Sequence, residues 1–245
     1  FFFKNEIFSK IYEKDKKLHH RLKKNFKGIS KYGHLEPIVC TNDFGLKDKC
    51  NSKTPQKYNI GVIGDSIIQG VGLSYDQTLV GILNQNNSLS FANLGTGSYS
   101  PLIYFHRLKE LIKSDFLFDH IIVFIDISDI QDETLYSFQN GIITHKFDEI
   151  GVYETEEIQK SQNTNIISKL RNFVFNNFKL TFSTISIIKR KFFLFDPYKV
   201  FPNNIPRYTW TFNNKLKDFH PDEIKTGIEN AKKNMDRIYK LLNEN

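Results

Sequence analysis

Hydrophobic and polar residues alternate with two different periods between residues 58 and 125. Short continuous apolar runs, typical of buried strands, are separated by segments whose apolar residues recur every three or four positions, as in helices. Strands and helices that alternate along a chain usually form a parallel sheet with helical crossovers. We therefore predict an α/β fold with strands at 59–63, 89–94 and 121–125 and helices at 77–83 and 101–114.

Local signals support three of these elements. Asp76 precedes the first helix and is placed to cap its N-terminus. Pro101 suits the first turn of the second helix. The run Ile121–Ile125 contains no polar residue, so we expect a central parallel strand covered on both faces.

The pattern before residue 58 is different. Apolar residues at helical spacing among many lysines predict an N-terminal helical arm, either an amphipathic helix or a mobile segment, over residues 4–27. Residues 28–57 are rich in turn-forming residues and predict loops with one strand near 37–41. We divide the chain into an arm and lead-in at 1–57 and an α/β domain at 58–245.

The regular alternation ends after Asp132, and we expect an insertion over about 138–215. Residues 141–153 predict a hairpin around Asp148–Glu149, and 166–193 predict a long packing helix. Lysines and arginines interrupt this helix, which argues against a membrane span. An irregular loop from 196 and a helix at 221–242 follow.

The chain is basic, with a net charge of +7 and a lysine cluster at 14–27. Such a cluster suits nucleic acid, anionic polysaccharide or a membrane surface. Because no nucleic-acid-binding motif accompanies it, we favour a solvated lysine-rich face and expect no nucleic-acid partner.

Two features bear on the compartment. Cys40 and Cys50 form neither a redox pair nor a zinc-ligand set, and they are either bridged or free. Phe1–Phe3 is far too short to span a membrane, but it suits the end of a signal or anchor helix upstream of Phe1. We expect an extracytoplasmic or membrane-anchored protein, with a cytoplasmic one as the alternative.

The sequence IGDSIIQGVG at 63–72 predicts a strand that ends in a small-residue elbow. Ligands of open α/β sheets bind at the carboxyl ends of the strands. Ser66 lies in this elbow and is a candidate nucleophile.

Three segments follow the three predicted strands in order: the elbow at Ser66, then NLGTGSYSP at 93–101, then VFIDISDIQDE at 123–133. Together they resemble the first three blocks of the SGNH (GDSL-type) hydrolase superfamily, over residues 58–133. The chain looks like a bacterial branch that acts on the cell envelope. The resemblance implies a three-layer, flavodoxin-like parallel sheet with helices on both faces.

The resemblance also implies roles for particular residues. Ser66 would attack an ester carbonyl, and the oxyanion would bind the Ser66 N–H and a backbone N–H at Gly97 or Ser98. The superfamily has glycine at the position of Ser98 and asparagine at the position of Ser128, so Ser128 would donate through a shorter side chain.

The acidic residues near these blocks have a simpler interpretation. Asp65 is expected to brace the elbow through backbone hydrogen bonds, with Asp129 in support. The acidic run in the third block suggests a metal site, but carboxylates after a parallel strand often cap the next helix. We favour capping and expect neither a metal nor a cofactor; the run comprises Asp126, Asp129, Asp132 and Glu133.

The catalytic base is the least determined part of the site. The superfamily places it in a D-x-x-H block after the last strand, and we expect that block beyond Asn245. Within the chain, His220 is the alternative, with Asp218 two residues upstream instead of three.

The leading hypothesis is a serine esterase that removes O-acyl groups from a small molecule, a lipid or a polysaccharide. One alternative is an O-acyltransferase that uses the same serine, and another is a non-catalytic domain that binds carbohydrate or a partner. A nucleotide-binding flavodoxin-like protein is a weaker alternative, because no glycine-rich phosphate loop opens directly into a helix.

Overall fold

The computed structural model describes residues 11–30, 35–86, 88–145 and 221–244. Residues 1–145 and 217–245 belong to one compact unit, to which everything below refers. The helix predicted at 166–193, the loop predicted from 196, Asp218 and His220 lie outside the described residues. The described elements are β1 (Tyr12–Asp15), β2 (His19–Leu22), β3 (Lys27–Ile29), β4 (Ile38–Thr41), β5 (Lys47–Asp48), β6 (Lys57–Ile63), α2 (Ser66–Gln69), η1 (Tyr75–Gln77), α3 (Leu79–Asn86), β7 (Phe91–Asn93), α4 (Pro101–Lys113), β8 (Leu117–Val123), α5 (Ile127–Leu135), β9 (Tyr136–Gln139), β10 (Ile142–His145) and α13 (Pro221–Asn243).

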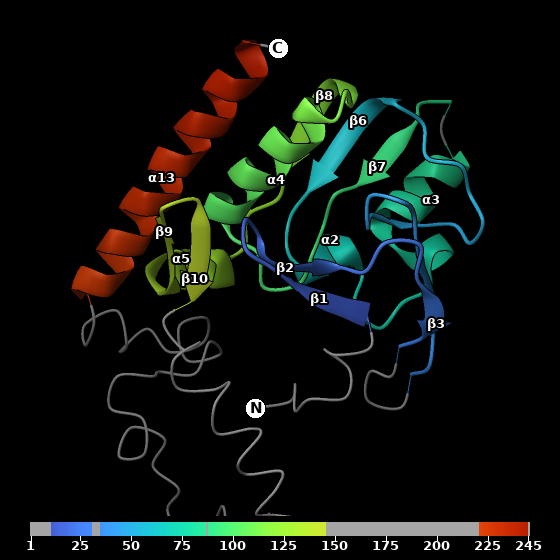
Figure 1. The fold of residues 1–245 in the computed structure, drawn as a ribbon, viewed down its shortest axis with the longest axis horizontal. Helices are drawn as coiled ribbons and strands as arrows, with labels where there is room; N and C mark the ends of the chain where they lie inside the picture. The colour runs from blue at the N-terminus through green and yellow to red at the C-terminus, as the bar shows by residue number, and fades with distance from the viewer. Residues whose placement is uncertain (1–10, 31–34, 87, 146–220, 245) are drawn as a thin grey trace, which may run out of the picture. The chain divides into compact units, whose positions relative to one another are not determined.

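A three-stranded parallel sheet in the order β7-β6-β8 forms the centre of the unit (Figure 1). Val62 of β6 lies opposite Asn93 of β7 on one side and Ile122 of β8 on the other. Because the strands are parallel, their carboxyl ends lie at one edge of the sheet, and the loops after them are neighbours. The predicted α/β character and parallel sheet are confirmed.

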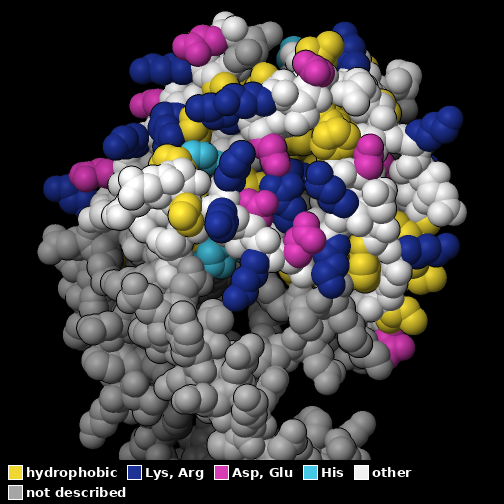
Figure 2. All heavy atoms as spheres, viewed as in Figure 1, with side chains coloured by type: hydrophobic (Ala, Val, Ile, Leu, Met, Phe, Trp, Pro, Cys, Tyr) yellow, Lys and Arg dark blue, Asp and Glu magenta, His cyan; other side chains and the backbone are white. Residues whose placement is uncertain are grey.

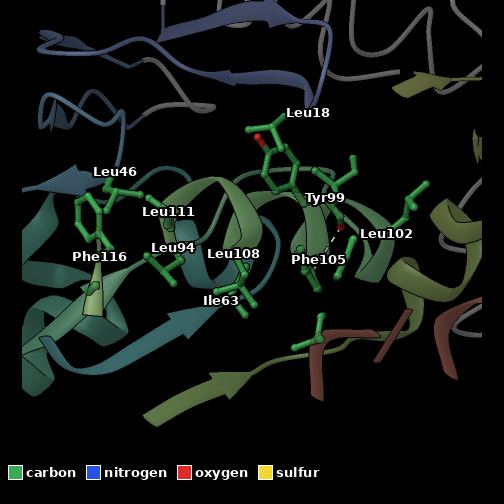
Figure 3. Close-up of a cluster of buried hydrophobic side chains, with 14 of the residues drawn as sticks. Leu18, Leu46, Ile63, Leu94, Tyr99, Leu102, Phe105, Leu108, Leu111 and Phe116 are labelled. Carbon is green, nitrogen blue, oxygen red and sulfur yellow. Dashed lines mark hydrogen bonds between the residues drawn. The ribbon is translucent and has the colours of Figure 1, made fainter. Parts of the chain in front are cut away.

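Alternate residues of β6 enter two separate hydrophobic clusters, as expected for a strand whose side chains point to opposite faces. Ile63 packs in a cluster with α4, which Figure 3 shows around Leu94 and Leu108. Val62 packs in a second cluster with Ile68 of α2 and with α3. Burial of these aliphatic side chains is the main favourable contribution to folding here.

Glu133 joins three helices. Its carboxylate lies at the start of α4, where it accepts hydrogen bonds from the Leu102 N–H and the Ser100 hydroxyl. Asn234 of α13 donates to the same carboxylate at 2.9 Å. The helix predicted at 221–242 is therefore confirmed, and it packs against α4 and α5 (Figure 1).

The third strand differs from the prediction. β8 begins at Leu117, four residues before the predicted start, and its Ile122 side chain is 41% exposed. Among the described residues β8 is an edge strand, and the second cluster covers only β6 and β7. The expectation of a strand covered on both faces is thus wrong for the part of the chain that the structure describes.

The predicted N-terminal helix is wrong over residues 12–27. β1 and β2 form an antiparallel hairpin instead. A carboxylate oxygen of Asp15 accepts the N–H groups of Lys17 and Leu18, which turns the chain back after one strand. Tyr12 and Leu22 are buried in this hairpin, so the apolar spacing that predicts a helix is satisfied by two short strands.

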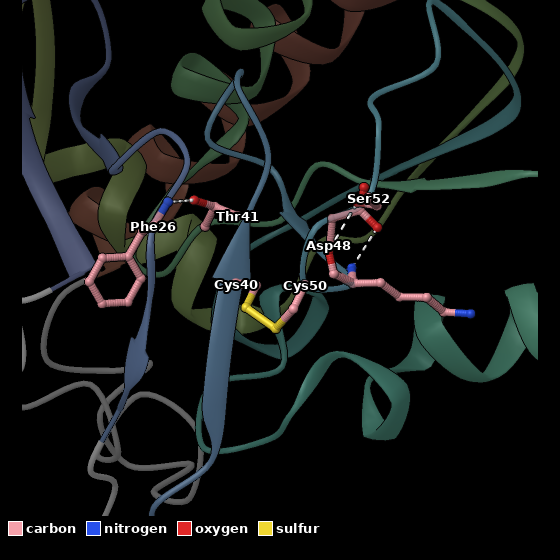
Figure 4. The surroundings of a disulfide bond; sticks show 7 residues. Phe26, Cys40, Thr41, Asp48, Cys50 and Ser52 are labelled. Atoms are coloured by element: carbon pink, nitrogen blue, oxygen red, sulfur yellow. Dashed lines mark hydrogen bonds between the residues drawn. A yellow bond between two sulfur atoms is a disulfide. The ribbon is translucent and has the colours of Figure 1, made fainter.

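The lead-in region contains more sheet than predicted. The strand expected near 37–41 is present as β4, but it also pairs with β3 and β5. Cys40 of β4 forms a disulfide bond with Cys50, two residues after β5 (Figure 4). The alternative of two free thiols is therefore wrong in this structure.

A hairpin that was not predicted from the sequence begins just before the one predicted at 141–153, most of which lies outside the described residues. β9 and β10 pair around Asn140 and Gly141, and both residues have positive φ angles (50° and 79°). Asn-Gly is the strongest sequence signal for a two-residue hairpin turn. The turn predicted at Asp148–Glu149 lies outside the described residues.

The cap of α3 also differs from the prediction. Thr78 accepts the Gly81 N–H at 3.0 Å and occupies the capping position expected for Asp76. Asp76 lies instead in the preceding turn η1, which begins with a capping box between Ser74 and Gln77. The segment therefore consists of two short helical elements, and each has its own cap.

Lys and Arg side chains lie among Asp and Glu side chains over the described part of the face in Figure 2. This mixed distribution is consistent with a solvated lysine-rich face. None of the helices described is both long and apolar enough to cross a bilayer.

We expect the Cys40→Ser/Cys50→Ser double variant to lower the free energy of unfolding by about 3 kcal/mol, because the bond closes a short loop in the unfolded chain. Urea denaturation with and without dithiothreitol measures this effect. Dithiothreitol should lower the urea midpoint of the wild type and leave that of the double variant unchanged. Equal urea midpoints for both proteins, with and without dithiothreitol, would contradict the prediction.

Lys47 of β5 is buried, at 2% exposure, in the antiparallel sheet formed by β3, β4 and β5. Its ammonium group donates to the Gly70 and Leu73 carbonyl oxygens at 2.8 and 2.6 Å. Burial lowers the pKa of Lys47 to about 8. The β3–β4–β5 sheet therefore fixes the segment from Gly70 to Leu73, which follows α2 directly.

This burial predicts a pH dependence of stability. The folded Lys47 releases its proton near pH 8 and the unfolded one near 10.5, so the unfolded state binds more protons between these values. The free energy of unfolding should rise by roughly 1 to 2 kcal/mol between pH 8 and about 9.5. Lys47→Met should remove this rise in urea titrations, whereas exposed Lys49→Met should keep it. A rise that persists in Lys47→Met would argue against a buried ammonium.

Candidate functional site

Ser66 lies at the carboxyl end of the central strand β6, as the first residue of α2. Its side chain is half-buried, and its hydroxyl donates to a carboxylate oxygen of Asp65 at 3.0 Å. The other oxygen of Asp65 accepts the Ile67 N–H at 2.8 Å and caps α2. The predicted bracing role of Asp65 is confirmed.

The loop after β7 packs directly against this elbow. A β-carbon added to Gly95 would lie 2.3 Å from the backbone nitrogen of Gln69, so only glycine allows the two backbones to approach this closely. A β-carbon added to Gly97 would lie 3.8 Å from the Ser66 β-carbon. The first two sequence blocks are therefore neighbours in space.

The two candidate backbone donors of this loop differ. The Gly97 N–H donates to the Gln69 side-chain oxygen at 2.5 Å and is already used. Among the residues that the structure describes, the N–H groups of Ser66 and Ser98 have no hydrogen-bond acceptor. Ser98 adopts a φ of 60°, a left-handed conformation that favours glycine.

The loop after β8 contributes a helix cap. One oxygen of Asp126 accepts the N–H and the hydroxyl of Ser128, both at 2.5 Å, as well as the Asp129 N–H. In return, Asp129 accepts the Asp126 N–H at 3.1 Å, which completes a capping box on α5. The capping interpretation is confirmed for Asp126 and Asp129, whereas Asp132 and Glu133 lie inside α5 and do not cap it. The Ser128 hydroxyl is directed at Asp126.

The caps of α2 and α5 lie close together. One carboxylate oxygen from each of Asp65, Asp126 and Asp129 lies within 4.8 Å of the others. These are the described residues that could jointly hold a cation. However, both oxygens of Asp65 accept hydrogen bonds, and Asp126 and Asp129 serve the cap of α5. Hydrogen bonds thus engage both oxygens of Asp65 and one oxygen each of Asp126 and Asp129, whereas Asp129 Oδ1 is buried without a hydrogen-bond partner among the described residues.

Asp129 is 1% exposed and accepts a hydrogen bond from the Tyr104 hydroxyl at 3.0 Å. Burial, together with the negative charges of Asp126 and Asp65, raises the pKa of Asp129 to about 8. Its carboxyl group therefore carries a proton at neutral pH. This proton lowers the negative charge beside Ser66, where an oxyanion would otherwise be repelled.

Three aromatic residues from two hairpins also hold the loop after β7. The Tyr12 hydroxyl donates to the Gln69 oxygen that binds Gly97, at 2.7 Å. His20 lies 2.8 Å from the Gly97 carbonyl oxygen, and the Tyr136 hydroxyl donates to the Ser98 carbonyl at 2.9 Å. Burial raises the pKa of Tyr12 to about 12, so its hydroxyl stays protonated.

Sequence reasoning missed these three residues. Tyr12 and His20 lie in the segment predicted as a helical arm, and Tyr136 lies just before the predicted insertion. His20 is 77 residues away from Gly97 along the chain. No strand-like alternation marks the first of these segments, because Tyr12 is buried and the next two residues of β1 are both exposed. The structure brings together Ser66, Gly97, Ser98 and the acidic caps, and the predicted base and its carboxylate partner, His220 and Asp218, lie outside the described residues.

The chain matched none of the family models against which it was scanned, and a search of curated proteins found no relative.

We expect Asp129→Asn to change how stability depends on pH. The carboxyl group titrates near 3.8 when unfolded and about 8 when folded, so the wild type loses stability as pH rises between these values. The variant lacks this loss and should be more stable than the wild type at pH 8, by at least about 1 kcal/mol.

Urea titrations at pH 5 and pH 8 measure the effect. Asp236→Asn, on an exposed position of α13, is the matched control and should follow the wild type. Parallel pH profiles for the wild type and Asp129→Asn would show that Asp129 is charged when folded.

Proposed function

We propose that this protein is a serine ester hydrolase of the SGNH type, with Ser66 as the nucleophile. The proposal includes the finer fold prediction, a three-layer flavodoxin-like arrangement. The described sheet supports it, because its strand order β7-β6-β8 corresponds to 2-1-3 among the parallel strands, as at the start of flavodoxin-like sheets.

One observation carries the proposal: the loops after three adjacent parallel strands meet at Ser66. Gly97 lies so near the serine that an added β-carbon would be 3.8 Å from the Ser66 β-carbon, and the carboxylates of the third loop lie beside Asp65. The N–H groups of Ser66 and Ser98 have no acceptor among the described residues. Two backbone donors beside a partly exposed serine hydroxyl are the elements of an oxyanion hole.

The reaction would proceed by acyl transfer. The Ser66 oxygen attacks the ester carbonyl, and its proton passes to a histidine base and then to the leaving alcohol. The tetrahedral oxyanion binds the N–H groups of Ser66 and Ser98. Water then cleaves the acyl-serine and regenerates the hydroxyl. The base would be a histidine; within the chain His220, with Asp218 two residues upstream, is the candidate, and both lie outside the described residues.

The proposed substrates are O-acyl esters of a cell-envelope polysaccharide, a lipid or an acylated small molecule, outside the cytoplasm. The Cys40–Cys50 bond favours an oxidising compartment. If a sugar hydroxyl replaces water in the second step, the same residues give an O-acyltransferase.

A non-catalytic binding domain is the second candidate, and two contacts favour it. Ser66 donates its hydroxyl to Asp65, and Ser128 donates to Asp126, so both hydroxyls are engaged by carboxylates. In such a domain the same rim would bind a carbohydrate or a partner without attacking it.

Ester hydrolysis separates these candidates. The full-length protein should hydrolyse p-nitrophenyl acetate, and Ser66→Ala should reduce kcat by at least about 1000-fold, because the acyl-enzyme cannot form. Ser74→Ala, in a turn of the same domain, is the control and should retain activity. Equal rates for the wild type and Ser66→Ala would exclude Ser66 as the nucleophile.

A further inference from the structure

The Gly97–Ser98 peptide is held at both ends. The Gly97 N–H donates to Gln69, and the Ser98 carbonyl accepts a hydrogen bond from Tyr136. Between them, the Gly97 carbonyl oxygen lies 2.8 Å from His20 Nε2. In a planar trans peptide the carbonyl and the following N–H point in opposite directions. The contact with His20 therefore also determines where the Ser98 N–H points.

The protonation of His20 follows from its partners. A carbonyl oxygen only accepts hydrogen bonds, so His20 Nε2 carries the hydrogen. His20 Nδ1 lies 2.8 Å from His19 Nδ1, and a neutral His20 accepts a hydrogen bond there from His19. The contact with His19 at Nδ1 is compatible with the Nε2–H form of His20 that donates to Gly97.

The surroundings of His20 restrict its movement. The side chain is 5% exposed, and its ring makes edge contacts with Tyr12 and Tyr99. The Tyr99 hydroxyl donates to the His20 carbonyl oxygen at 2.5 Å. His20 is therefore anchored through both its backbone and its ring, on a hairpin distant in sequence from the blocks that surround Ser66.

We infer that His20 is a positioning residue of the proposed hydrolase: it fixes the Gly97–Ser98 peptide so that the Ser98 N–H faces the oxyanion. This inference rests on the proposed function, and it makes the β1–β2 hairpin part of the site. His20 does not touch the substrate in this arrangement. It acts on the transition state only by orienting the Gly97–Ser98 peptide, whose N–H would bind the oxyanion.

Two substitutions of His20 test the inference by steady-state kinetics with p-nitrophenyl acetate. His20→Phe keeps a ring but removes the donor, and kcat should fall about 100-fold, as when one oxyanion donor is lost, with KM within about twofold. His20→Gln can donate from its amide and should stay within about tenfold of the wild type. His120→Phe, on the exposed side of β8, is the control and should leave kcat unchanged.

Active-site titration with a fluorophosphonate and thermal melting separate loss of folded enzyme from a slower reaction. If His20→Phe is unfolded at the assay temperature, His19→Gly replaces it, because glycine accepts the φ of 65° at this position. That variant should lower kcat roughly tenfold through loss of the partner that orients His20. A kcat per titrated site within about threefold of the wild type in His20→Phe, or in His19→Gly where that variant replaces it, would overturn the inference.

The Ser98 amide resonance in ¹⁵N–¹H spectra gives a readout that does not depend on activity. It should shift in His20→Phe and stay near its wild-type position in His20→Gln. If the wild type does not hydrolyse esters, the proposed function fails, and this resonance still decides whether His20 orients the peptide. An unchanged Ser98 resonance in His20→Phe would overturn the inference.

Discussion

The parallel pairing of β6 with both β7 and β8 is the constraint on which the candidate site depends. Parallel strands place their carboxyl ends at one edge, and three loops separated by about thirty residues in sequence therefore meet there. The approach is close enough that Gly95 cannot carry a side chain. The elbow at Ser66 and the loop at Ser98 are consequently held by backbone contacts, which leave little freedom to either.

The same edge gathers negative charge, which would hinder an enzyme that stabilises an oxyanion. Most of the acidic groups have a structural role, since Asp65 caps α2, and Asp126 and Asp129 form the capping box of α5. The raised pKa of Asp129 then removes one charge at neutral pH. The same residue therefore has both effects: the Asp129 carboxyl group completes the capping box of α5, and because it keeps its proton it adds no negative charge beside Ser66.

The N-terminal segments act as a support for this edge. Tyr12 and His20 hold the loop after β7, and Lys47 holds the chain after α2 through two carbonyl oxygens. The disulfide bond stabilises the small sheet that carries Lys47. The lead-in is thereby coupled to the candidate site, although it contributes no nucleophile.

The sequence by itself determined the parallel α/β core, the position of Ser66 after its central strand and the capping role of Asp126 and Asp129. Apolar periodicity, small-residue elbows and helix caps are local signals, which is why these features could be predicted. Only the tertiary structure decided the N-terminal hairpin, the edge position of β8 and the contacts of His20 and Tyr136 with the loop after β7. Those features depend on pairing between distant segments, and two short strands and one helix can bury the same apolar residues, as Tyr12 and Leu22 show. Hydrogen bonds that orient a single peptide, such as Gly97–Ser98, cannot be predicted from sequence periodicity. They join residues that can lie at any distance along the chain, as His20 and Gly97 do.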